Sequence, residues 1–241
     1  MCKTPSPSLF FPLFPLFVLV SFGQLQASII TTPTDLNVGD QYRLVFVTSG
    51  TMTAESGDIA DYNTFVDGFG DVAIASDWKA IGSTSEVDAS ENTLTRPDVD
   101  SASSVPIYNL AGQRVADGYV DLWDQAILAA IDVTETGTEM STYTQAWTGT
   151  AVEGDASESG VLGEGYPLDQ VIYGYVGLTD FQWIRANAVP GTNINHVYGM
   201  SGTLTVSAPD PIPEPASVIT WTLLGIVGCV GTWWNRRRKA S

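Results

Sequence analysis

The chain has 241 residues, of which 44% are hydrophobic, and its net charge at pH 7 is −17. Residues 28–213 hold 26 of the 27 acidic residues and 5 of the 10 basic ones, a net charge of −21. Nucleic-acid binding is excluded for this segment, because a polyanion is bound by a basic patch. A well-solvated surface explains the acidity, and so does a requirement for Ca²⁺ or another hard cation.

An apolar block near the N-terminus predicts a secretory signal peptide. The block covers residues 9–22, follows a basic residue and is interrupted by Pro12 and Pro15. It is too short and too broken for a transmembrane helix. We therefore expect cleavage after Ala27, which removes residues 1–27 from the mature protein.

Residues 28–208 are long enough to form one sizeable exported domain. Neither Cys2 nor Cys229 lies in this segment. The domain therefore has no disulfide, no thiol nucleophile and no cysteine-based metal site, although export would permit disulfides.

The hydrophobic pattern of residues 28–208 predicts an α+β domain with two early helices and a β-rich second half. Polar and Gly-containing stretches separate the elements. In chain order, the expected elements are a strand at 42–47, a helix from 59 to 68, a strand at 78–81, a polar loop at 82–104, strands at 105–110 and 112–115, a helix at 119–127, and strands at 144–148, 171–178, 182–185 and 196–206.

Two loops concentrate oxygen ligands of the kind that Ca²⁺ prefers. Neither loop has the ligand order of an EF-hand, and solvated loops rich in Asx turns explain the same composition. No other cofactor is expected. The candidate metal ligands are Asp88, Glu91 and Asn92 in the first loop and Glu153, Asp155 and Glu158 in the second.

Catalytic motifs are scarce. His196 is the only histidine, and no Gly-x-Ser-x-Gly elbow accompanies it, so we interpret it as an ordinary strand residue. A glycosidase needs only two carboxylates at a fixed separation, but acids are so abundant here that no single pair stands out. The tryptophans at 78, 123, 147 and 183 are expected in the core, because a domain without disulfides needs large buried side chains.

The C-terminal region has the composition of a membrane anchor in three parts. A Pro-rich spacer, 209–215, precedes the uncharged segment 216–234 and the basic tail 235–241. A helix over 216–234 would be about 28 Å long at ~1.5 Å per residue, close to the ~30 Å hydrocarbon core of a bilayer. The tail should remain in the cytoplasm by the positive-inside rule. Its basic residues are Arg236, Arg237, Arg238 and Lys239.

The spacer ends in Pro213, Glu214 and Pro215, and this triplet followed by an apolar helix and an Arg-rich end resembles the PEP-CTERM sorting signal of exopolysaccharide-producing bacteria. The resemblance covers residues 213–239. It implies recognition by an exosortase, an integral-membrane transpeptidase that cuts near the triplet. The protein would then start in the inner membrane with its domain exported and finish at the cell surface or in the extracellular matrix. The expected partners are this processing enzyme, the membrane and extracellular polysaccharide.

Five short motifs of the body lie at 105–110, 123–124, 147–150, 180–184 and 197–200. Taken in order, they resemble the C-type-lectin-like fold, with the endostatin-like and bacterial surface branches as the nearest. The resemblance implies two helices flanking a twisted antiparallel core, with ligands on a long irregular loop region. The chain departs from the class in lacking its disulfides and its Glu-Pro-Asn and Trp-Asn-Asp sugar-binding signatures, so no sugar-binding residue carries over.

Together these features predict a non-enzymatic, membrane-anchored surface or matrix protein whose domain is a binding or structural module. The alternative is an extracellular hydrolase of glycosidase type that uses two carboxylates. A cleft with two convergent, partly buried acids would favour the hydrolase, and acids scattered over a convex surface would favour the module. An inert component of the polymer layer is a third hypothesis.

Overall fold

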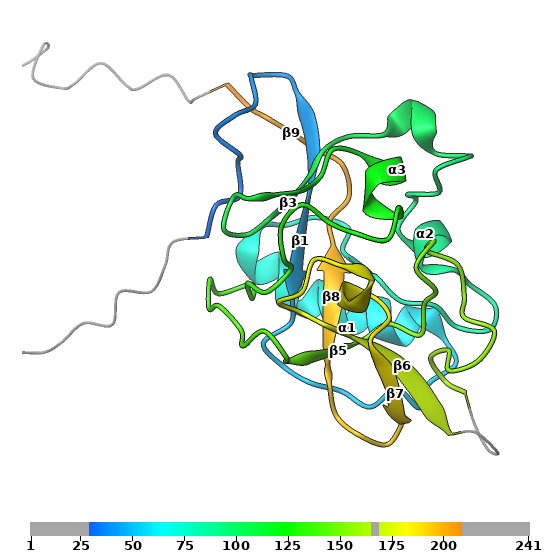
Figure 1. Ribbon diagram of the computed structural model, residues 1–241. Helices are drawn as coiled ribbons and strands as arrows, with labels where there is room; N and C mark the ends of the chain where they lie inside the picture. Colours follow the sequence, from blue (N-terminus) through cyan, green and yellow to red (C-terminus); the bar gives the residue numbers. More distant parts are fainter. Residues whose placement is uncertain (1–28, 165–168, 209–241) are drawn as a thin grey trace, which may run out of the picture.

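The computed structural model describes residues 29–164 and 169–208, which form an α+β domain around a nine-stranded mixed sheet (Figure 1). The predicted fold class is confirmed at this level. Among the described residues, no helix is long and apolar enough to cross a membrane. The predicted signal peptide, the Pro-Glu-Pro spacer, the apolar segment 216–234 and the basic tail lie outside the described residues.

The sheet follows the order β4-β3-β1-β8-β5-β6-β7, with β2 paired to β8 and β9 paired to β1. The pairs β1–β3 and β5–β8 are parallel, and the other pairs are antiparallel. The C-type-lectin-like resemblance implied an antiparallel core, so these two pairs depart from it. The strands are β1 (Gln41–Val47), β2 (Lys79–Ala80), β3 (Ile107–Asn109), β4 (Arg114–Ala116), β5 (Gln145–Trp147), β6 (Gln170–Tyr175), β7 (Asn187–Pro190), β8 (His196–Met200) and β9 (Leu204–Thr205).

Strand β1 lies in the middle of the sheet and is buried on both faces. Leu44 and Phe46 point into one hydrophobic cluster, and Val45 and Val47 point into the other. This alternation explains why the strand is a continuous apolar run in the sequence.

Helix α1 (Ile59–Ala73) covers one face of the sheet, where it contacts β2 and β8. The Asp58 side chain accepts a hydrogen bond from the Ala60 amide at 2.9 Å and caps the helix. The predicted end at Gly68 was wrong, because the helix continues to Ala73. Its next glycine, Gly70, lies against the ring of Trp78, so this glycine serves close packing rather than termination.

Two further predictions were wrong in the segments that cover the other face. The loop 82–104 contains the one-turn helix α2 (Ala89–Asn92) and the 3₁₀ turn η1 (Ser101–Ser103). The helix expected at 119–127 is only one turn long, α3 (Tyr119–Leu122). It stops because Ile127 donates its amide to Thr179 at 2.8 Å, which draws the chain toward another segment.

Near the C-terminal end, the predicted strand 182–185 is instead the 3₁₀ turn η2 (Phe181–Trp183). Asp180 caps this turn by accepting the Gln182 amide at 3.0 Å. Strand β7 follows this turn. The sequence did not predict it, because its residues lack the alternation of buried and exposed positions that indicates a strand. The prediction that the four body tryptophans lie in the core is confirmed, since all are at most 4% exposed.

Candidate functional site

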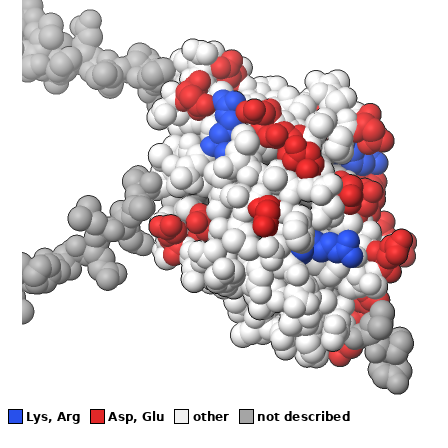
Figure 2. Space-filling view, viewed as in Figure 1, with Lys and Arg blue, Asp and Glu red and all other residues white. Residues whose placement is uncertain are grey.

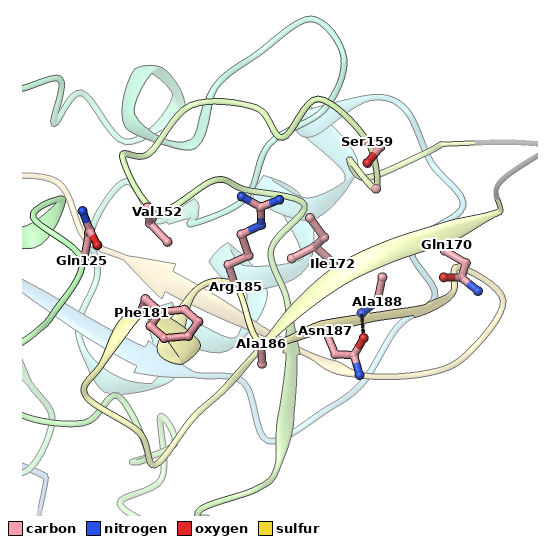
Figure 3. A pocket seen from close by; sticks show the side chains of 11 residues that line it. Gln125, Val152, Ser159, Gln170, Ile172, Phe181, Arg185, Ala186, Asn187 and Ala188 are labelled. Carbon is pink, nitrogen blue, oxygen red and sulfur yellow. Dashed lines mark hydrogen bonds between the residues drawn. The ribbon is translucent and has the colours of Figure 1, made fainter.

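A surface groove of about 790 Å³ lies at the β6–β7 end of the sheet (Figure 3). Segments far apart in the sequence contribute to it: the stretch after α3, the loop between β5 and β6, strand β6, and strand β7 together with the turn that precedes it. Its lining residues are Gln125, Val152, Ser159, Gly160, Gln170, Ile172, Phe181, Arg185, Ala186, Asn187 and Ala188.

The turn η2 gives the groove its exposed aromatic side chain. Trp183 is 1% exposed and fills the core, whereas Phe181, two residues earlier, is 49% exposed. The turn lies so close to β6 that a Cβ at Gly174 would overlap the carbonyl oxygen of Trp183. Packing against the sheet therefore holds the Phe181 ring at the surface of the groove.

Arg185 follows directly from this turn. Its amide donates to the Phe181 carbonyl oxygen at 3.0 Å, a link that closes one turn of the chain, and both side chains line the groove. In Figure 3 the guanidinium rises in the middle of the lining side chains, with Val152 and Ile172 on either side of it in this view. The groove thus combines an apolar surface with a central cation.

Arg185 is the exposed cation of the described residues that has no carboxylate partner. Lys79, Arg96 and Arg114 each form an ion pair with a carboxylate, and Arg43 is 3% exposed. Arg43 donates to two backbone carbonyl oxygens, at 2.7 and 2.6 Å. Acidic side chains dominate the face shown in Figure 2, yet no Asp or Glu among the described residues lines the groove.

Uncharged polar groups complete the groove. Gln125 has a φ of 86°, a left-handed conformation that is uncommon for residues with a side chain. The hydroxyl of Ser159 and the amides of Gln170 and Asn187 lie at the opposite end in Figure 3. Amides and hydroxyls both donate and accept hydrogen bonds, so these groups match a ligand rich in hydroxyls.

The structure brings together the two loops that supply the candidate metal ligands. The Asp88 carboxylate accepts the Ala156 amide at 2.6 Å, and the Ser90 amide donates to the Gly154 carbonyl oxygen at 3.0 Å. Partial burial, and then the nearby negative charges of Asp88 and Glu153, raise the pKa of the Asp155 carboxyl.

The other candidate ligands have different tasks. Glu91 pairs with Arg96 at 3.7 Å, and Asn92 donates to Asn63 and to the Ala80 carbonyl oxygen, which ties α2 to α1 and β2. Glu158 is exposed. Across the described ranges, no group of three His, Cys, Asp or Glu side chains is arranged to hold a metal ion.

A second hollow, of about 530 Å³, contains two carboxylates. Asp132 and Glu139 line it together with apolar residues and backbone of the segments 110–113 and 128–137. Burial, reinforced by the negative charge of Glu139, raises the pKa of the half-buried Asp132 carboxyl. The hydrolase alternative requires two carboxyl groups of which one has a raised pKa, and this hollow is lined by two such groups.

His196 lies in strand β8, as expected from the sequence. Its Nδ1 is 2.7 Å from the Thr48 carbonyl oxygen and 3.1 Å from that of Gly50, so the ring donates a hydrogen bond to the backbone. This bond gives the histidine a structural role at the end of β1.

Sequence reasoning missed both principal residues of the groove. Phe181 lies within a motif that indicates only the fold resemblance, and Arg185 lies within a predicted strand. Arg185 had one available signal, as one of only five basic residues in residues 28–213.

Comparison with known proteins gives no relative from which to carry over a role. No protein-family model matches the chain, and no curated protein matches it at a significant level. A role for the chain therefore has to be inferred from its own residues.

Proposed function

We propose that this protein is an exported, non-catalytic binding module of the cell surface or extracellular matrix, and that the β6–β7 groove binds an extracellular polysaccharide. One observation carries the proposal. The groove presents an exposed aromatic ring, a cation without a carboxylate partner and several amides, and no described lining residue is acidic.

Each part of the groove suits a sugar chain. The ring of Phe181 offers an apolar face for a pyranose ring, and Val152 adds apolar surface to the lining. Gln125 and Gln170 supply donors and acceptors for hydroxyl groups. The groove is open to solvent and not a closed chamber, so part of a polymer can enter it.

The lectin-like assignment belongs to this proposal. Helix α1 on one face and the long irregular connections on the other support it, whereas the parallel pairs β1–β3 and β5–β8 do not. Superposition on solved C-type-lectin-like domains tests the assignment. The assignment is wrong if the strands of these parallel pairs have no counterparts in those domains. The proposed binding site would be unaffected, because it uses no Ca²⁺ and no signature of that class.

Delivery to the surface is proposed to use the C-terminal sorting signal. The supporting feature is the order of triplet, apolar segment and basic tail over residues 213–239. Replacement of Pro213, Glu214 and Pro215 by alanine should block processing and surface delivery. Unchanged processing of that variant would contradict the exosortase part of the proposal.

The binding proposal is tested by co-sedimentation of the protein with insoluble polysaccharides. Phe181→Ala should weaken binding about tenfold, because it removes the ring on which a sugar stacks, a contact worth roughly 1.4 kcal/mol. The matched control is Tyr143→Ala, which removes another aromatic side chain that is 69% exposed and lies outside the groove lining. Absence of binding by the unaltered protein, or an equal loss in both variants, would contradict the proposal.

The hydrolase alternative has one specific observation in its favour, the paired acids Asp132 and Glu139 in the second hollow. It requires that polysaccharides are shortened on incubation with the protein and that Asp132→Asn abolishes this activity. The binding module requires intact polymer after the same incubation. Measurement of reducing ends therefore separates the two functions.

A further inference from the structure

We propose that the polysaccharide bound in the β6–β7 groove carries carboxylate groups, as uronic acids do, and that Arg185 binds one of them. This inference rests on the proposed function, since it names the chemical class of the ligand for that same site. A neutral sugar chain would need the aromatic and amide groups but would leave the guanidinium without a partner.

The first argument is the distribution of charge. Residues 28–213 contain 26 acidic and 5 basic residues, so carboxylate partners for an arginine are abundant. Three of the other four cations have such a partner, and the fourth is buried against carbonyl oxygens. Arg185 nevertheless forms no ion pair with any described residue, and no described residue that lines the groove is acidic. Its partner is therefore expected to come from a ligand.

The second argument is the geometry of the guanidinium. A guanidinium presents several N–H donors in one plane and binds a carboxylate through two parallel hydrogen bonds. The hydrogen bond from the Arg185 amide to the Phe181 carbonyl oxygen closes one turn of the chain between the two residues, and both side chains line the groove. A sugar ring stacked on Phe181 can then present a ring carboxylate to Arg185.

The edge of the sheet argues against an acidic peptide as the ligand. Strand β7 is the last strand of the sheet, and an exposed edge is where a peptide strand would add. The Gly191 amide points toward β6 and donates to the Asp169 carbonyl oxygen at 3.3 Å. The backbone groups of the alternate residues Ala188 and Pro190 therefore point away from β6, toward the open edge.

Neither Ala188 nor Pro190 has a backbone N–H that is free to donate to an added strand. Asn187 Oδ1 accepts the Ala188 amide at 2.9 Å, as drawn in Figure 3, and Pro190 has no N–H. An added peptide strand would find no backbone N–H on this edge for its ladder. A polysaccharide needs no such ladder, because it binds through side chains.

The acidic body does not prevent this interaction at physiological salt. The screening length is about 8 Å at 0.15 M ionic strength, so carboxylates that lie outside the groove act weakly on a ligand within it. The contact with Arg185 is direct and is screened much less. Because the side chain is exposed, we expect a moderate preference for the charged ligand, about threefold to tenfold in affinity.

The test compares two ligands with the same backbone, oligogalacturonides with free carboxylates and the same oligomers with methyl-esterified carboxylates. Titration calorimetry with the purified protein at 0.15 M salt should show threefold to tenfold tighter binding of the free form. Arg185→Gln should bring this ratio to about one. Lys79→Gln is the matched control, because it removes the same charge outside the groove and should keep the ratio.

Each outcome separates the inference from the proposed function. Equal binding of both oligomers, with no effect of Arg185→Gln, would overturn the inference and leave a module for neutral sugars. Binding of neither these oligomers nor neutral glucans would overturn both. Tighter binding of an oligoglutamate peptide than of the free oligogalacturonide, lost in Arg185→Gln, would assign the groove to an acidic peptide and overturn the inference.

Discussion

At the scale of single residues, the environment of a carboxyl group decides what it can do, and Asp132 is the clearest case. Its backbone carbonyl oxygen accepts the Met140 amide at 2.7 Å, which fixes the residue at the rim of the second hollow. Burial and the charge of Glu139 make ionisation of the side chain costly, so its pKa is raised in the folded state. The sequence contains 27 acidic residues and does not show which of them has a raised pKa.

Asp132→Asn should therefore stabilise the protein at neutral pH. A carboxyl with a raised folded pKa holds its proton more tightly in the folded state, so the wild type loses stability as pH rises from the ordinary value of 3.8 through the folded pKa. The urea concentration at the unfolding midpoint should be higher for the variant than for wild type at pH 7, and the two should be equal below about pH 3.8. Glu86→Gln, at an exposed position, is the control for the change in net charge. A higher midpoint of Asp132→Asn that persists at low pH would contradict the raised pKa of Asp132.

At the scale of elements, strands were predicted more accurately than helices. The run at 42–47 and the pieces at 105–115 were correct, because β-branched and aromatic residues followed by turn residues are local signals. The boundary at Gly68 was wrong, because a glycine in the sequence does not show whether it ends a helix or makes room for a neighbour. The length of α3 was also wrong, because the hydrogen bond from Ile127 to Thr179 joins segments that are far apart in the sequence.

The two glycines of α1 give a matched test of this distinction. Gly68 is exposed, and a Cβ there would meet nothing within 4 Å, so Gly68→Ala should stabilise the protein by about 0.5–1 kcal/mol through helix propensity. A Cβ at Gly70 would lie 2.5 Å from the Trp78 ring, so Gly70→Ala should destabilise it by about 1–3 kcal/mol. Chemical denaturation of both variants measures the difference, and shifts of the same sign would show that α1 does not pack on Trp78 as described.

At the scale of the whole molecule, the sequence predicted the class of domain but not its site. The predicted α+β class and the buried tryptophans are confirmed, because composition and periodicity report on burial. The groove is formed by four separate segments, and the contact of Asp88 with Ala156 likewise joins two loops that the sequence treats separately. Such assembly depends on the order of strands in the sheet, which no local pattern encodes.

Occupation of the groove around Phe181 and Arg185 by a sugar chain can be mapped residue by residue with nuclear magnetic resonance. Titration of the isotope-labelled protein with an oligouronide should shift the side-chain signals of Phe181, Arg185 and Gln125, and leave those of Tyr143 and Asp132 unchanged. A response centred on Asp132 and Glu139, or none at the groove while the oligomer binds, would show that the sugar chain binds elsewhere on the protein.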